Sequence, residues 1–327
     1  MFHAFFAVIP VFCIIGFGVL LRARDVLPEN AGPVIGVYVL KVSLPLLILH
    51  LLAGANPDDL ARGGFWLALI GSQLVVYALG YVGDRLFCRR GTGPAVISGL
   101  SCSACNAAFV GLPIVYNLWP GNNEAMLVAG LAILTPNVVM ILAQARLDLL
   151  AGSLAWKGGS ALNFVGSLLR IFILGNPILL ATLFGAVLSV SRLGLWEPLD
   201  SAISLVGFTA APCMLLALGL DLRQKLAVAT RRAQGGVVPR QIWFVVCKLV
   251  LHPLLCWGIM YALGITGLWL TIPILISATA TALLVSVIAQ VYSAVPEEAA
   301  LTAVVSNGVS IVTLTGFVWL FSVLGML

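Results

Sequence analysis

The sequence predicts an all-α polytopic membrane protein made of two inverted repeats of five helices each. Of its 327 residues, 61% are hydrophobic and only 9% are charged, whereas a soluble domain carries about 25% charged residues. The charges lie in short clusters between apolar runs of roughly 17–28 residues, and each run can cross a ~30 Å hydrocarbon core as a helix. A second observation is an internal repeat, because the segment at 277–296 resembles the segment at 101–120 without a gap.

The first five helices are expected at 3–21, 32–52, 65–86, 94–118 and 123–145. The N-terminus lacks the basic region that opens a secretory signal peptide, so we interpret the first run as a retained span. This run ends at Arg22 and Arg24. The linkers between the later runs carry Pro, Gly, Asp, Asn and Arg, as the ends of spans usually do.

The last five helices are expected at 171–190, 199–220, 241–263, 267–290 and 299–326. A short cytoplasmic linker at 151–170 separates the two halves, and the stretch 150–169 is also compatible with a short interfacial helix. The chain therefore divides into a first repeat at 1–150, the linker, and a second, inverted repeat at 171–327.

Basic residues set the expected orientation of the helices. With the N-terminus outside, thirteen of the 17 Lys and Arg residues fall in cytoplasmic loops, and only Arg62 and Arg192 fall in external loops. The remaining two, Lys41 and Lys248, lie within spans. This bias predicts that both chain termini are external, and five helices per half then make the two halves inverted copies.

The two repeated segments are unusual for membrane spans. They read SCSACNAAFVGLPIVYNLWP at 101–120 and SATATALLVSVIAQVYSAVP at 277–296, and both are rich in small, polar or helix-weakening residues. Five residues of the first segment recur in the second at a constant offset, namely Ser101, Ala104, Val115, Tyr116 and Pro120. Spans that are weakened at equivalent places of an internal repeat indicate the binding site of a secondary transporter.

Several segments spread over nearly the whole chain carry a family pattern. They are KVSLPLLIL (41–49), FVGLPIVYNLWP (109–120), GNPILLATLFGAVLS (175–189), APCMLLALGLDLR (211–223) and IAQVYSAVPEEAALTAVVSNGVSIVTLTG (288–316). In their order and spacing, these segments resemble the auxin efflux carrier family.

The resemblance implies ten helices in two inverted repeats, with the fourth and ninth helices unwound and crossing at the substrate site. It also implies a helical bundle related to bile-acid and sodium–proton exchangers that works by an elevator-like motion. The known substrates of the family are organic anions: auxin in plants, and malate or malonate in bacterial members. Because the linker at 146–170 is short, the chain resembles a bacterial permease of the inner membrane.

One departure from the family concerns the ninth helix. The family commonly has a proline early in this helix, but residues 278–295 contain none. A continuous ninth helix is therefore an alternative to the unwound one.

The fourth helix carries the strongest candidates for substrate binding. Pro113 cannot donate a backbone hydrogen bond and clashes with the carbonyl group of Phe109, and Gly111 adds flexibility. A break near 107–113 would expose two half-helix ends, and N-terminal ends attract carboxylates. Asn106 lies just before this break and offers both a donor and an acceptor. The alternative is an ordinary proline kink, with Asn106 hydrogen-bonded to a neighbouring helix.

Three ionisable residues within spans are further candidates. Lys41 lies about ten residues into the second span, where a Lys costs about 2.5–3.5 kcal/mol on insertion scales. It either neutralises a substrate carboxylate or snorkels to the cytoplasmic face. Lys248 and His252, spaced i and i+4, share one side of the eighth span and are candidate coupling residues. Their alternative roles are a Lys near the cytoplasmic end and a His bonded to a backbone carbonyl.

Five polar residues complete the candidate substrate-binding set: Asn137, Thr279, Thr281, Ser286 and Asn307. The two asparagines fall at comparable places of the two repeats, where they would line the crossover or bridge helices. The hydroxyl groups of the ninth span would satisfy backbone groups that unwinding sets free.

These features favour a secondary transporter that moves a small organic anion, a mono- or dicarboxylate such as malonate or malate, by alternating access. The alternatives are an ion channel or uncoupled uniporter, although no filter is evident, and a carrier of an auxin-like aromatic carboxylate. No motif of an intramembrane enzyme appears.

The expected partners are the organic anion and the lipid bilayer. A homodimer is a further alternative. The net charge of +5 reflects membrane topology and not nucleic-acid binding. Cys102 and Cys105 have no second pair or nearby His to complete a metal site, so no cofactor is expected. No Asp or Glu lies clearly in mid-span, and coupling to H⁺ or Na⁺ is therefore not visible.

Overall fold

The computed structural model describes residues 2–151, 177–232 and 239–327, and in these ranges every regular element is a helix. Almost all of the expected linker at 151–170, and the start of the span expected at 171–190, lie outside the described residues. Six helices in the described ranges are long and apolar enough to cross a membrane: Ala31–Ala53, Pro57–Phe87, Asn123–Leu150, Glu197–Asp221, Arg240–Ala262 and Pro296–Val323. Shorter apolar helices lie at Cys13–Ala23, Ala107–Leu118, Pro177–Ser191 and Leu268–Ser277.

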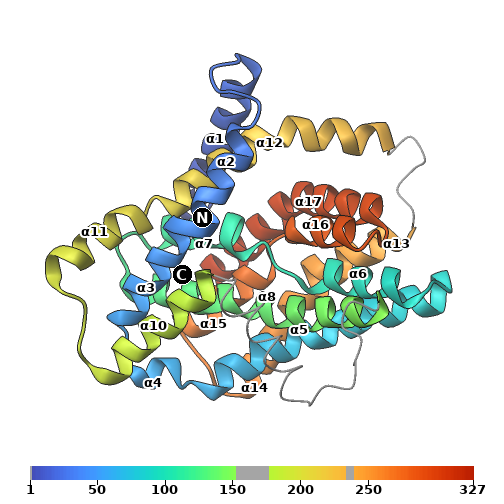
Figure 1. Cartoon of the computed structure of the whole chain (residues 1–327). Coiled ribbons are helices and arrows are strands. Elements are labelled where there is room, and N and C mark those ends of the chain that lie inside the picture. Colours follow the sequence, from blue (N-terminus) through green and yellow to red (C-terminus); the bar gives the residue numbers. More distant parts are fainter. Residues whose placement is uncertain (1, 152–176, 233–238) are drawn as a thin grey trace, which may run out of the picture.

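The helices form two groups. The first group lies at the left and top of Figure 1 and contains α1 (Phe2–Ala23), α2 (Ala31–Tyr38), η1 (Val39–Ser43), α3 (Leu44–Ala53), α10 (Pro177–Ser191), α11 (Glu197–Gly207) and α12 (Ala210–Arg232). In this group α3 packs against α10 and α11, and α12 packs against α1 and α2.

The second group occupies the centre and right of Figure 1. It contains α5 (Gly63–Gly83), η2 (Asp84–Cys88), α6 (Thr92–Ser103), α8 (Asn123–Leu150), α13 (Pro239–Val246), η6 (Cys247–Leu251), α14 (His252–Ala262), α15 (Leu268–Ser277), α16 (Leu284–Val291) and α17 (Pro296–Val323). The short helix α4 (Pro57–Leu60) precedes α5, while η3 (Ala107–Gly111) and α7 (Leu112–Leu118) contact helices of both groups.

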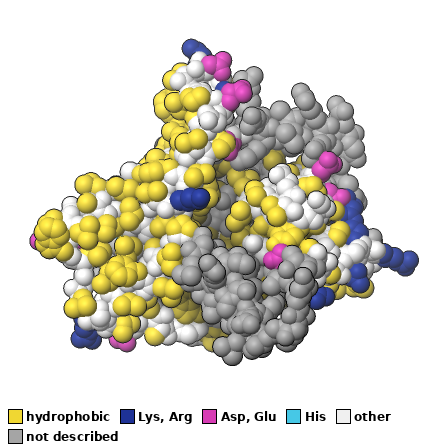
Figure 2. Space-filling view, in the orientation of Figure 1, with side chains coloured by type: hydrophobic (Ala, Val, Ile, Leu, Met, Phe, Trp, Pro, Cys, Tyr) yellow, Lys and Arg dark blue, Asp and Glu magenta, His cyan; other side chains and the backbone are white. Residues whose placement is uncertain are grey.

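The outer surface is apolar, as a protein surrounded by lipid requires. Figure 2 shows hydrophobic side chains over most of the described part of one face, with charged side chains mainly toward its edges. Large apolar residues such as Phe184, Val187 and Leu205 are more than half exposed. In a soluble protein such a surface would cause aggregation.

Three widened, π-helical turns stand directly before prolines. The turns η1, η3 and η6 each lead into a helix whose second residue is proline, namely Pro45, Pro113 and Pro253. In an α-helix a proline lacks the backbone N–H and clashes with the carbonyl group four residues earlier. A π-helical turn shifts the register of the backbone, so that the proline ring faces a different carbonyl group. The helix therefore continues through each of these prolines.

Both repeated segments are interrupted helices. The helix expected at 94–118 stops at Ser103 and resumes at Ala107, and the helix expected at 267–290 stops at Ser277 and resumes at Leu284. The alternative prediction of a continuous ninth helix is therefore wrong. The break expected near 107–113 is also misplaced, because the chain there is already helical and Pro113 is accommodated by η3. The span expected at 199–220 lies within Glu197–Asp221 and contains a turn at Phe208 and Thr209, where α11 passes into α12.

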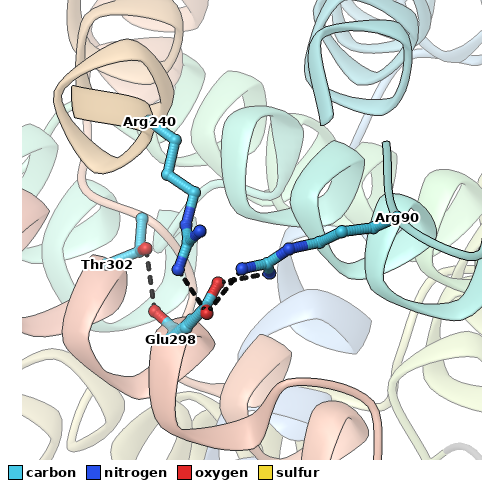
Figure 3. Close-up of polar contacts among 4 residues, drawn as sticks. All are labelled: Arg90, Arg240, Glu298 and Thr302. Carbon is cyan, nitrogen blue, oxygen red and sulfur yellow. Dashed lines mark hydrogen bonds and ion pairs between the residues drawn. The ribbon is translucent and has the colours of Figure 1, made fainter. Parts of the chain in front are cut away.

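An ionic cluster ties the ends of three helices in the second group. Glu298, in the first turn of α17, pairs with Arg90 before α6 at 2.7 Å and with Arg240 of α13 (Figure 3). Each of these side chains is about a quarter exposed or less. The carboxylate also lies near the positive end of the α17 dipole. The cluster therefore fixes the loop before α6 relative to α13 and α17.

Candidate functional site

The two interruptions meet and pair with each other. The amide of Asn106 donates to the carbonyl oxygen of Ala280 at 2.8 Å, and the amide of Ala282 donates to that of Ala104 at 2.9 Å. These two bonds form an antiparallel bridge between Cys105 and Thr281. Backbone groups that leave a helix inside a membrane need new partners, and here each interruption supplies them to the other.

Side chains hold the same crossover. The buried hydroxyl of Thr281 donates to the carbonyl oxygen of Ser101 at 2.7 Å, and the hydroxyl of Ser306 in α17 accepts from the amide of Thr281 at 3.1 Å. The hydroxyl of Thr279 donates to the carbonyl of Ile276, near the end of α15, at 2.7 Å. The hydroxyl groups of Thr279 and Thr281 thus bond backbone carbonyl groups at the second interruption, which contains no proline.

A cavity of about 390 Å³ opens beside the crossover. One wall comes from α2, η1, α3 and α12 of the first helix group, and the other comes from the two interruptions, η3, α8 and α16. The lining is mostly apolar, and its polar residues are Asn106, Asn137, Asp221 and Ser286. A mostly apolar cavity with a few placed polar groups, at the interface of two helix groups, is typical of a small-molecule site.

Asn106 is the most buried of the four polar residues that line the cavity. Asn106 is only 3% exposed, and its Nδ2 has no hydrogen-bond partner among the residues that the structure describes. A buried donor without a partner is costly, so a ligand that accepts this bond would remove the cost. A bond between the Asn106 side chain and a neighbouring helix, the alternative reading, is not formed by Nδ2.

Two half-helices begin at this cavity. The continuous helix formed by η3 and α7 starts at Ala107, and its first intrahelical bond is made by the amide of Val110 to the carbonyl of Asn106 at 3.0 Å. The amides of residues 107–109 precede that bond, and these residues line the cavity. Helix α16 also begins there, since Leu283 and Leu284 line the same space. Helix N-termini carry partial positive charge and attract anions.

The comparison with known proteins identifies the family of the chain. The sequence matches the family described as membrane transport protein over residues 3–148 and 161–318. The chain belongs to this family, the auxin efflux carrier family. It is 29% identical over 319 residues to a protein of Rhizobium meliloti (strain 1021) named "Putative malonate transporter", and the match covers 96% of this chain and 94% of the relative. The protein is therefore an integral membrane protein of a transporter family.

Three of the expected substrate-binding residues line the cavity of this family member, namely Asn106, Asn137 and Ser286. The side-chain amide of Asn137 lies 3.3 Å from the carbonyl of Leu134 in its own helix, and the hydroxyl of Ser286 donates to the carbonyl of Leu283. Both contacts are local, so neither residue bridges helices through them.

Four expected residues are buried and do not line the cavity: Gly111 and Pro113 in the half-helix that follows the first interruption, and Thr279 and Thr281 in the second interruption. A Cβ atom on Gly111 would lie 3.2 Å from Cγ1 of Ile276. The absence of a side chain at Gly111 therefore lets η3 approach the end of α15 closely.

Two expected residues lie apart from the cavity. Lys41 is exposed on η1, and Asn307 of α17 donates from Nδ2 to the carbonyl of Ala303 in its own helix at 2.7 Å. Neither contributes to the cavity lining.

The candidate coupling residues are fully buried next to the crossover. Nζ of Lys248 donates to the carbonyl of Ser277 at 2.7 Å and lies 3.2 Å from Nδ1 of His252. It also lies 3.4 Å from Sγ of Cys105. Lys248 therefore lies against the crossover and not at the end of its span, Arg240–Ala262.

Two cavity residues escaped the sequence reading. From the sequence, Asp221 was interpreted as a residue near the end of a span, and Cys105 as a small packing residue. In the structure both line the cavity, and Oδ1 of Asp221 would lie 2.1 Å from a Cβ atom on Gly32. No motif marks either residue. Asp221 reaches the cavity through the packing of α12 against α2, and Cys105 reaches it through the pairing of the two interruptions.

Proposed function

We propose that the protein is a secondary active transporter that moves a small organic anion across the bacterial inner membrane by alternating access. The observation that carries this proposal is the pairing of the two interrupted helices beside the cavity that contains Asn106. Continuous transmembrane helices close their backbone groups on themselves, whereas interrupted ones offer polar groups to a solute at mid-membrane.

The proposed architecture has ten spans in two inverted repeats, at 1–150 and 171–327, with both termini external. The first helix group then acts as the scaffold, and the second group carries the crossover and moves against it. The cavity lies between the two groups, so a displacement of one group would open it to alternate sides. This arrangement matches the elevator-like motion that the family resemblance implies.

Three groups of the cavity favour a carboxylate, and the side chain of Asp221, which also lines it, opposes negative charge. Two helix N-termini meet there, and each favours negative charge near its first amides. Asn106 Nδ2 adds a donor that has no partner within residues 2–151, 177–232 and 239–327. We take a dicarboxylate of the size of malonate or malate as the substrate, because a relative that covers nearly the whole chain is named for malonate.

The test is counterflow of labelled malonate in proteoliposomes. The wild-type protein is expected to show saturable uptake that is accelerated by unlabelled malonate inside. Asn106→Ala is expected to raise KM by roughly tenfold or more, because a hydrogen bond to a charged group is worth about 1.5–3 kcal/mol.

Asn117→Ala is the matched control. Asn117 lies on the same half-helix, donates to the carbonyl of Pro113 at 2.8 Å and does not line the cavity. It is expected to keep the wild-type KM. Equal KM values for a folded Asn106→Ala variant and the wild type would remove Asn106 from the site. Large currents without saturation would identify a channel instead.

A further inference from the structure

Lys248 is a fully buried lysine without a carboxylate partner in the described part of the chain. Its side chain is 0% exposed, and no described Asp or Glu oxygen lies within 4.0 Å of its Nζ. Buried charges are normally paired, because the loss of hydration is otherwise uncompensated. The protein holds the ammonium group with the carbonyl of Ser277 and with Nδ1 of His252. Both are neutral acceptors.

The position of Lys248 relative to the cavity is specific. Cys105 lines the cavity, and its Sγ atom lies 3.4 Å from Nζ of Lys248 and 3.7 Å from Nδ1 of His252. One side chain thus separates the ammonium group from the space where the anion would bind. Lys41, in contrast, is exposed and does not line the cavity.

We propose that Lys248 is the fixed cation that balances the charge of the transported anion, acting on the cavity from behind the wall formed by Cys105. This inference rests on the proposed function and names the residue that gives the site its preference for negative charge. An ammonium group separated from a carboxylate by one side chain acts through a medium of low dielectric constant, where Coulomb attraction is strong. His252 is a positioning residue, because Nδ1 accepts from Nζ when the imidazole proton is on Nε2.

A purely structural role for Lys248 predicts a different result. Its Nζ donates to the carbonyl of Ser277, the last residue of α15, and a cation stabilises the C-terminal end of a helix. If this were its sole role, loss of the charge would weaken every substrate by the same factor. The charge of the ligand is therefore the variable to change.

The experiment compares malonate with its monoamide, which has a similar shape and one carboxylate fewer. KM is measured by counterflow for the wild type, Lys248→Met and Lys248→Arg. Lys248→Met is expected to weaken malonate roughly tenfold or more and the monoamide clearly less, so that the preference for the dianion falls. Lys248→Arg is expected to retain much of that preference. An equal loss for both ligands, or no loss, would overturn the inference.

A second pair of variants covers the case that Lys248→Met does not fold. Cys105→Asp places a fixed carboxylate beside Lys248 and is expected to reduce the preference for malonate, whereas the neutral Cys105→Asn is expected to retain it. Equal preferences in these two variants would also overturn the inference. If the wild type shows no counterflow with either ligand, the proposed transport function itself is contradicted. That outcome differs from the loss of charge preference that tests Lys248.

Discussion

The backbone amide of Asn106 donates to the carbonyl oxygen of Ala280 at 2.8 Å, so the two halves of the chain pair where both helices stop. The return bond, from the amide of Ala282 to the carbonyl of Ala104, makes the pairing reciprocal. Each interruption thereby compensates for the helical bonds that the other lost. This explains why the second interruption needs no proline at 278–283.

Thr281→Val is expected to destabilise the crossover by about 1–2 kcal/mol. The valine keeps the shape of threonine but removes the donor to the carbonyl of Ser101, and a buried acceptor without a partner is costly even among membrane helices. Thermal unfolding in detergent, followed by tryptophan fluorescence, measures the change. Thr281→Ser retains the hydroxyl and should lie closer to the wild type.

Thr315→Val is the matched control for this prediction. The Thr315 hydroxyl is exposed and donates to the carbonyl of Ile311 in its own helix. This variant is expected to unfold like the wild type. A Thr281→Val protein as stable as Thr315→Val would show that the bond between the two interruptions contributes little.

Glu298→Gln is expected to lower stability by roughly 1–3 kcal/mol, between the values for exposed and for fully buried ion pairs. The substitution removes the charge that holds both Arg90 and Arg240 (Figure 3). The melting temperature is the readout. Asp25→Asn is the control, because Asp25 is 87% exposed and pairs with Arg22 at 3.5 Å. Similar melting temperatures for the two variants would contradict the prediction.

Gly219→Ala is expected to separate α12 from α1 and to cost roughly 1–3 kcal/mol, as overpacking does in other cores. A Cβ atom there would lie 2.2 Å from the carbonyl oxygen of Ile15 and 3.0 Å from Cα of Gly18. The free energy of unfolding in denaturant measures the effect. Gly316→Ala is the control, since nothing lies within 4 Å of its Cβ position, and alanine favours a helix over glycine. Destabilisation by both variants alike would argue against the close contact.

The location of the interruptions was largely predictable, and their details were not. The small and polar residues of the repeated segments indicated that both helices are weakened. Asn106 was expected just before the break, whereas in the structure it lies within the interruption. Pro113 suggested a break that begins too late, because a proline in the second position of a helix can be absorbed by the π-helical turn before it. The second interruption depends on pairing with the first, which no local pattern encodes.

The roles of the two lysines within spans could not be separated by sequence. Both lie in apolar runs, and a helix that is apolar on all faces carries no sign of which face meets lipid. Packing places Lys248 against the crossover with no exposed surface and leaves Lys41 exposed.

The sequence alone determined that this is a helical membrane protein of a transporter family, with two weakened helices in corresponding places. These properties follow from hydrophobicity, charge position and local helix chemistry, which act over a few neighbouring residues. The tertiary structure decided which polar groups reach the cavity and which cation lies behind it. Those contacts join residues far apart in the chain, so they depend on how whole helices rotate and pack against one another.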